Sequence, residues 1–318
     1  MNNEIIGFGI DVDFKDRSKI EIAKIITYLE KLKVDWVRIN LDIKRAKDPK
    51  YISTLKLAIY KLKQKNINTL GLITEFVPGN FTNIFFSHLN FKKVEENIDE
   101  ILQSVKILSL NLEIKHWEIW NEQNIHRFWH SRPNPHFYVE FVSKTSNVIK
   151  EVIKDAKIIF GGINGNDLEP IFPDIKPFFY YKGFLKKSLK LGVSKFTDFI
   201  AFHPYHIACY FSFHNKTWFK SKIKSLMDNL VDKHPKLKFI VTEFGINPSF
   251  NFKLNIKDIA EIYKNLIEHS KKKNIPICFY NLIDDPEHNY SKLAFDNNFG
   301  FLDNKLNEKD LYKEFIKA

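Results

Sequence analysis

The sequence predicts an α/β fold of eight parallel strands alternating with helices, best described as one (β/α)8 TIM barrel spanning residues 1–318. Two observations lead to this prediction. The chain has 318 residues, an ordinary length for a barrel that typically takes about 250 residues or more. Short apolar, β-rich runs also alternate with longer segments of helical period. A doubly wound open sheet satisfies the same alternation, so the pattern alone leaves both architectures open.

Each expected strand is a short apolar run, as strands buried on both faces of a parallel sheet should be. The runs are 5–12, 35–40, 69–73, a fourth ending at Asn121-Glu122, 158–162, 199–203, a seventh centred on Val241, and 277–282. Between them, apolar residues recur at helical spacing, as in Ile22, Ile25, Ile26, Leu29 and Leu32, or Ile256, Ile259, Tyr263, Leu266 and Ile267. No linker, repeat or low-complexity segment suggests a second domain.

The composition is that of a soluble globular protein, with 44% hydrophobic and 27% charged residues. No run approaches the roughly 20 apolar residues that a membrane-spanning helix needs, so no membrane insertion is expected. The N-terminus lacks a basic segment followed by a long apolar one. We therefore expect no secretory signal and a cytoplasmic protein.

The two cysteines, Cys209 and Cys278, are far apart and lie in apolar surroundings, which predicts buried free thiols. No CxxC motif is present. His203 and His206 are three residues apart, but no third ligand follows at a matching spacing. We therefore expect no metal and no other cofactor.

The net charge is +11, from 49 basic and 38 acidic residues. Such a charge could attract nucleic acid, an anionic membrane or an acidic glycan. Most of the lysines fall on the expected helices, opposite the apolar stripe, where a solvated exterior explains them. No recognisable nucleic-acid module occurs. The charge therefore indicates a modest preference for anionic ligands and no nucleic-acid partner.

Two glutamates stand where an apolar strand gives way to a loop, Glu122 in the fourth strand and Glu243 in the seventh. Glutamate is seldom buried without a partner, so a carboxylate at such a position is held or used by something. Glycoside hydrolysis needs two carboxyl groups, one to protonate the departing oxygen and one to attack or stabilise the sugar cation. A single active centre could bring these two together.

Three motifs carry a resemblance to a known group of enzymes. They are Trp117-Glu118-Ile119-Trp120-Asn121-Glu122, His203-Pro204-Tyr205 and Val241-Thr242-Glu243-Phe244-Gly245. Together they resemble the clan A retaining glycoside hydrolases, most closely family 39 and its relatives. The resemblance implies a (β/α)8 barrel, with Glu122 as acid/base after strand four and Glu243 as nucleophile after strand seven. It decides between the two architectures in favour of the barrel.

The resemblance also implies roles for the neighbouring residues. Arg38 and Tyr205 would hold Glu243 ionised, Asn121 would donate to the sugar 2-hydroxyl, and His203 would orient Glu122 or the sugar. Trp129 and Trp218, in polar loops, are candidates to stack on sugar faces. Tyr280 stands where a tryptophan commonly floors the sugar site. The implied partner is an oligosaccharide or polysaccharide, cleaved with retention by carboxyl groups about 5–5.5 Å apart.

Other interpretations remain open at this point. Arg38 could be a core charge satisfied by Glu75 or Asp11, and Asn121 could merely cap a loop. The chain departs from the clan at Gln123, where proline is usual, and at Phe279-Tyr280. A catalytically silent carbohydrate-binding barrel is therefore one alternative. A metal-dependent phosphodiester hydrolase is a second alternative, which the positive charge mildly favours.

Overall fold

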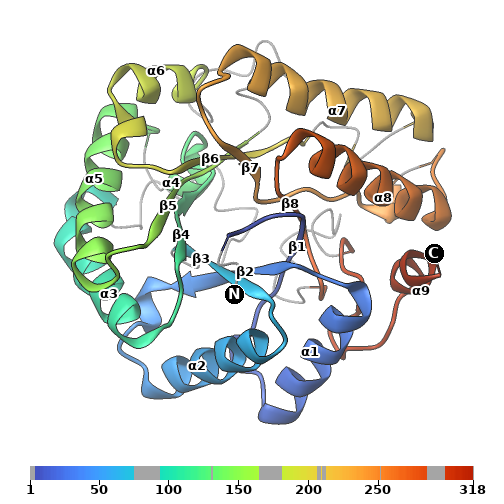
Figure 1. Cartoon of the computed structure of the whole chain (residues 1–318), viewed down its shortest axis with the longest axis horizontal. Helices are drawn as coiled ribbons and strands as arrows, with labels where there is room; N and C mark the ends of the chain where they lie inside the picture. Colours follow the sequence, from blue (N-terminus) through green and yellow to red (C-terminus); the bar gives the residue numbers. More distant parts are fainter. Residues whose placement is uncertain are drawn as a thin grey trace.

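The computed structural model describes residues 4–74, 94–129, 132–164, 181–205, 209, 213–250, 252–284 and 298–317. Its centre is a closed barrel in which strands β1 to β8 follow one another in chain order (Figure 1). The strands are β1 (Phe8–Asp11), β2 (Trp36–Asp42), β3 (Asn68–Thr74), β4 (His116–Asn121), β5 (Lys157–Asn164), β6 (Phe199–His203), β7 (Phe239–Val241) and β8 (Ile277–Phe279).

All neighbouring strands are parallel, and β1 pairs with β8 through Phe8 opposite Ile277 and Ile10 opposite Phe279. This last pairing closes the sheet, which an open doubly wound sheet cannot do. The predicted (β/α)8 barrel is therefore confirmed. That residues 1–318 form one domain stays a prediction.

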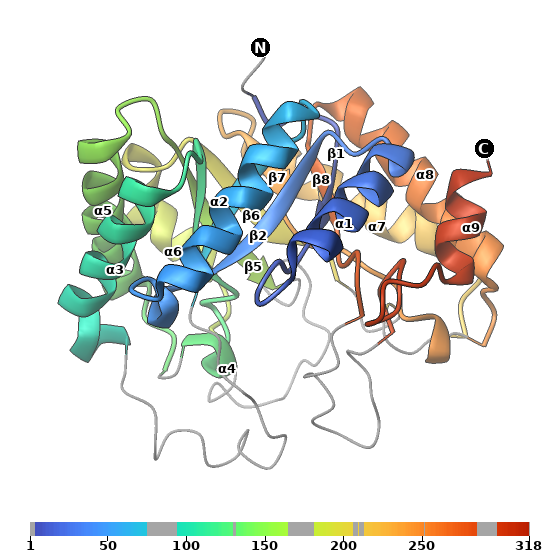
Figure 2. The same cartoon turned by 90° about the horizontal axis from the view of Figure 1, so that it is seen from below.

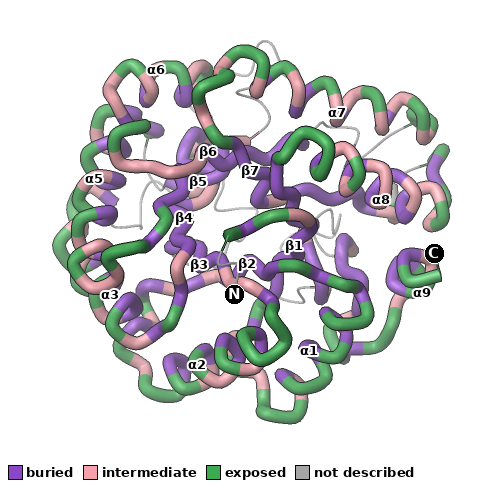
Figure 3. The backbone as a smooth tube through the Cα atoms, viewed as in Figure 1, coloured by how far each residue is buried: buried purple, intermediate pink, exposed green. Residues whose placement is uncertain are grey.

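Helices surround the barrel and turn their exposed faces outward (Figures 1 and 3). They are α1 (Lys19–Leu32), α2 (Pro49–Gln64), α3 (Ile98–Asn111), α4 (His126–Trp129), α5 (Pro135–Val152), α6 (Phe184–Lys190), α7 (Lys216–Lys233), α8 (Ile256–Lys273) and α9 (Asp310–Ile316). Local sequence fixes several starts. Ser18 with Glu21 and Asn255 with Asp258 form capping boxes that satisfy backbone donors at the first turns of α1 and α8.

The side chains inside the barrel change from apolar to polar along its axis. Toward the N-terminal ends of the strands it is filled by apolar side chains from several strands, namely Trp36, Leu70, Ile159, Ala201, Ile240 and Cys278, together with Ile5. Two residues beyond Trp36 on β2, the next inward position is the buried Arg38. The apolar plug thus gives way to a polar layer at the carboxyl ends, where barrel enzymes place their active sites.

Cys209 and Cys278 are both buried thiols that form no disulfide, as predicted. Figure 2 shows α4, which follows β4, at the end of the barrel away from the N-terminus. Among the described residues, no helix combines the length and the apolar character needed to cross a bilayer.

Candidate active site

Glu122 lies one residue beyond β4, on a backbone that leaves the strand in an unusual way. Trp120 and Glu122 both have positive φ angles, 72° and 44°. Residues other than glycine adopt a positive φ at a cost of about 1–3 kcal/mol each, and they retain this conformation only where surrounding contacts impose it. Here the amide of Glu122 donates to the Gly162 carbonyl at 2.9 Å, and its carbonyl accepts from the Ile125 amide at 2.8 Å. The chain therefore turns at Glu122 against the end of β5.

The Glu122 carboxyl group is held by two side chains from neighbouring strands. Its Oε1 accepts a hydrogen bond from Nδ2 of Asn164 at 2.9 Å and lies 3.0 Å from Nδ1 of His203. The residue is only 6% exposed. Gly162 makes room for this arrangement, because a Cβ there would lie 2.0 Å from His203 Nε2. Asn164 was not predicted from the sequence, although it ends β5 as Asn121 ends β4.

Glu243 follows β7, and its two carboxylate oxygens have different partners. Oε1 accepts from the Tyr205 hydroxyl at 3.1 Å, and Oε2 accepts from Nη1 of Arg38 at 3.1 Å. Both side chains that the sequence suggested as partners of Glu243 thus hydrogen-bond to it. Its side chain is 16% exposed, in contrast to the 2% of Arg38 beneath it. Glu243 is therefore the accessible end of a buried polar cluster.

Arg38 is the centre of that cluster. Its Nε and Nη2 donate to the two oxygens of Glu118 at 2.8 and 3.2 Å, and Nη1 lies 3.3 Å from Asp11. Nη2 also donates to Oδ1 of Asn121 at 2.8 Å. Burial alone would lower the pKa of the guanidinium, but the surrounding carboxyl groups, with Glu118 foremost, raise it well above its usual value.

Of the core partners considered for Arg38, Asp11 is confirmed, and Glu75 lies outside the described residues. Glu118 was missed as a partner, although an acidic residue in the middle of an apolar strand was a visible signal. Asn121 contributes more than a loop cap. Its Oδ1 accepts a hydrogen bond from Arg38, and its amide nitrogen Nδ2 is the hydrogen-bond donor of the side chain.

Asp11 is a third carboxyl group beside the same guanidinium, at the end of β1. Its pKa is raised to about 7, mainly by burial, while Arg38 lowers it and the charge of Glu243 raises it further. A carboxyl group with a raised pKa binds a proton on folding. The free energy of unfolding therefore falls as the pH rises from the unfolded pKa near 4 to the folded pKa near 7.

Replacing Asp11 by asparagine should remove this dependence. The difference in unfolding free energy, variant minus native, is expected to increase by about 4 kcal/mol between pH 4 and pH 8, since each pKa unit corresponds to about 1.4 kcal/mol. Urea denaturation across this range measures it. Two curves that stay parallel between pH 4 and pH 8 would contradict the assignment.

The aromatic residues that were predicted to stack on a sugar differ in how far they are buried. Trp129 is fully buried at the end of α4, with edge contacts to Trp120, Tyr138 and Phe141. The prediction that it stacks on a sugar is therefore wrong, because the ring is 0% exposed and packs against Tyr138 and Phe141 of α5. Trp117 and Trp120 are also buried in the core.

Trp218 lies in the first turn of α7, half-buried, with one face stacked on His214 at a centroid distance of 3.8 Å. Tyr280, directly after β8, is also half-buried and meets Phe299 edge-on at 5.8 Å. Stacking of either ring on a sugar stays a prediction.

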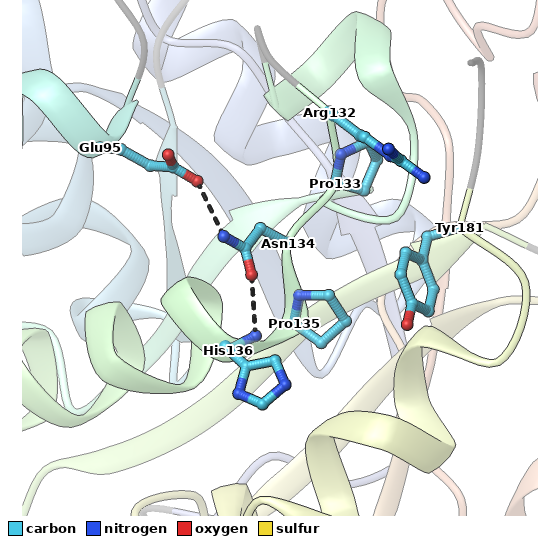
Figure 4. Close-up of a pocket in the computed structure, with 7 residues that line it drawn as sticks. All are labelled: Glu95, Arg132, Pro133, Asn134, Pro135, His136 and Tyr181. Atoms are coloured by element: carbon cyan, nitrogen blue, oxygen red, sulfur yellow. Dashed lines mark hydrogen bonds between the residues drawn. The ribbon is translucent and has the colours of Figure 1, made fainter. Parts of the chain in front are cut away.

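A cavity of about 400 Å³ opens beside the start of α5 (Figure 4). Its walls include Arg132, His136 and Tyr181, and Asn134 bridges Glu95 to the backbone amide of His136 at 3.3 and 3.1 Å. The amide of Tyr181 donates to the Asn124 carbonyl at 2.8 Å. The cavity wall is thus tied to the loop that carries Glu122.

No family model matches the chain, and no curated protein matches it in sequence. Many solved structures match the fold. One is a glucosidase from Croceicoccus marinus, with a TM-score of 0.69 and 13% identity over 99% of this chain and 67% of that one. Another is a GH5_18 protein from Streptomyces cattleya in complex with GlcNAc, with a TM-score of 0.68 and 12% identity over 99% and 80%.

A GH39 β-xylosidase from Caulobacter crescentus also matches, with a TM-score of 0.61 and 15% identity over 99% of this chain and 71% of that one. These neighbours are clan A glycoside hydrolases, the group that the sequence motifs resemble. Identities this low establish the fold alone. The chain therefore has the barrel that these glycosidases share. Within the described ranges, no group of three or more His, Cys, Asp or Glu residues is arranged to hold a metal ion.

Proposed function

We propose that the protein is a retaining glycoside hydrolase that cleaves O-glycosidic bonds by double displacement. The observation that carries the proposal is the placement of Glu122 and Glu243. They follow β4 and β7 of a closed barrel, and each is held by partners suited to one of the two roles that retaining hydrolysis requires. The fold shared with known glycosidases supports it.

Glu243 is assigned as the nucleophile. Its partners, the Tyr205 hydroxyl and the Arg38 guanidinium, both donate hydrogen bonds, which suits a carboxylate. In the first step an oxygen of Glu243 forms a bond to the anomeric carbon as the bond to the departing oxygen breaks. Nδ2 of Asn121 is assigned as a donor to the 2-hydroxyl, a contact that strengthens in the transition state.

Glu122 is assigned as the acid/base. In the first step its carboxyl proton passes to the departing oxygen, which leaves as an alcohol. In the second step the resulting carboxylate takes a proton from water, and that water oxygen replaces Glu243 on the anomeric carbon. Because two inversions occur at the same carbon, the product keeps the configuration of the substrate.

We further propose that the substrate is an oligosaccharide or polysaccharide, including anionic ones. The positive net charge and the exposed Arg132 in the cavity beside the Glu122 loop support this preference. The sugar itself is to be identified with a panel of aryl glycosides of both anomeric configurations.

On the substrate so identified, proton NMR during the first minutes should find a product of unchanged anomeric configuration. Glu122→Gln is expected to slow hydrolysis of poor leaving groups by about 10²- to 10⁴-fold, because proton donation is lost. With a dinitrophenyl leaving group, which needs no acid, the glycosyl-enzyme should accumulate and give a burst of phenolate.

Three outcomes would reject the proposal. An inverted product would rule out double displacement. Loss of turnover in EDTA, with Glu122→Gln and Glu243→Gln still active, would favour the metal-dependent phosphodiester hydrolase. Binding of a glycan without turnover of any glycoside would favour a carbohydrate-binding barrel.

A further inference from the structure

A chain of buried hydrogen bonds leads from Glu122 back into the barrel. Nδ1 of His203 lies 3.0 Å from Glu122 Oε1, and its Nε2 lies 3.1 Å from Oγ1 of Thr242. The same Oγ1 lies 2.9 Å from Oε1 of Glu118. His203, Thr242 and Glu118 are each 0% exposed. The direction of each of these hydrogen bonds is therefore set by the neighbouring protein groups.

The direction is fixed first at Glu118. Besides Thr242, this carboxylate accepts from the Gly162 amide at 2.9 Å and from two nitrogens of Arg38. An amide and a guanidinium can only donate. The Thr242 hydroxyl therefore donates its proton to Glu118.

A threonine hydroxyl has one proton, so Oγ1 of Thr242 must accept in its contact with His203. Nε2 of His203 is then the donor and carries a proton. The remaining contact joins Nδ1 to Oε1 of Glu122 at 3.0 Å. Two facing lone pairs would repel, so one proton lies in this contact and belongs to the pair.

We propose that Thr242 and Glu118 are positioning residues that act on the acid/base through His203. They hold the His203 ring with Nε2 protonated, and so keep Nδ1 and the shared proton directed at Glu122. This inference rests on the proposed role of Glu122. Thr242 immediately precedes Glu243, and Glu118 also binds Arg38, so the same two residues support both sides of the site.

The two oxygens of the Glu122 carboxyl group therefore have different roles. Oε1 is committed to His203 and Asn164. Among the described residues, nothing hydrogen-bonds to Oε2. In the acid form Oε2 therefore carries a second proton, which passes to the leaving group and is regained from water, while the proton between Nδ1 and Oε1 stays in its contact. If the ring of His203 lost its anchor, the carboxyl group could rotate, and misplacement of about 1 Å can cost about 10²-fold in rate.

Thr242→Val tests the inference, with Thr242→Ser as its matched control. Valine keeps the shape but removes the hydroxyl, and serine keeps the hydroxyl. Glu118 retains its bonds from Gly162 and Arg38 in both variants, so no charge is left unpaired. Thr242→Val should slow alkyl and unactivated aryl glycosides by about 10- to 100-fold. With dinitrophenyl glycosides, the burst of phenolate should slow by less than about threefold, because this step needs little acid, whereas the steady-state turnover, which needs Glu122 as base, should slow by about 10- to 100-fold. Thr242→Ser should keep the leaving-group dependence of the native chain.

A second readout needs no substrate. Nitrogen-15 NMR of histidine-labelled protein distinguishes the protonated from the bare ring nitrogen, and His203→Gln identifies the signals of His203. The native chain and Thr242→Ser should show Nε2 protonated. Thr242→Val should show a mixture of the two tautomers.

A bare Nε2 in the native chain would overturn the inference, as would a Thr242→Val variant that matches Thr242→Ser in both spectra and leaving-group dependence. Absence of any glycosidase activity would instead reject the proposed function, while the spectra would still decide where the His203 proton lies.

Discussion

Replacing Glu243 by alanine is expected to lower kcat/KM on aryl glycosides by about 10⁴-fold or more. The reason is that the residue forms the covalent bond in the first step, and loss of a nucleophile removes the whole pathway rather than a fraction of it. The measurement is the initial rate of phenolate release on the best substrate of the panel. Circular dichroism of the variant checks that the barrel is intact.

Sodium azide provides the control for this prediction. In Glu243→Ala, azide should enter the space of the missing carboxylate and attack the substrate directly, which yields a glycosyl azide of inverted configuration. In Glu122→Ala, azide should attack the glycosyl-enzyme and yield a glycosyl azide of retained configuration. The opposite pairing of variant and product would exchange the two roles. Full activity in either variant would remove that residue from the mechanism.

Replacing Arg38 by methionine is expected to reduce the free energy of unfolding by about 3–5 kcal/mol at pH 8, the range for breaking a buried ion pair from one side. Asp11, Glu118 and Glu243 would lose their common cation, and Glu118, which is 0% exposed, cannot recover hydration. Urea denaturation measures the loss. The loss should be smaller at pH 5, because the raised pKa of Asp11 keeps that carboxyl group protonated there.

A double variant separates the loss of stability caused by unpaired charge from the loss caused by changed packing. If unpaired charge causes the loss, Glu118→Gln should restore part of the stability in the Arg38→Met background while destabilising the native chain. Equal effects of Glu118→Gln in both backgrounds would show that the two side chains are not coupled. That result would contradict the hydrogen bonds at 2.8 and 3.2 Å between them.

Much of the fold could be predicted because it depends on local pattern. A strand buried on both faces must be apolar throughout, so runs such as 199–203 are visible in the sequence, and β6 (Phe199–His203) has those bounds in the structure. Helical periodicity located α1 and α8 in the same way. Strand ends such as those of β2 and β8 shifted by a few residues, since pairing with neighbours decides where a ladder stops.

The candidate site was predictable only where a motif marked it. Glu122, Glu243, Arg38, Tyr205 and His203 lie in or near recognisable patterns, and the structure brings them into one hydrogen-bonded cluster. Asn164 and the roles of Glu118 and Thr242 were not predicted, because they depend on side-chain hydrogen bonds between residues that are 39 to 124 positions apart in the sequence. Trp129 was misread because a polar loop in sequence can still fold its tryptophan into the core.

The amino-acid sequence by itself determined the alternation of strands and helices and the two acidic strand ends, because these follow from the chemistry of adjacent residues. Only the tertiary structure decided which charges share Arg38 and which atoms face the two ring nitrogens of His203. Those outcomes depend on burial and on distances between side chains of different strands, which arise only when the barrel closes.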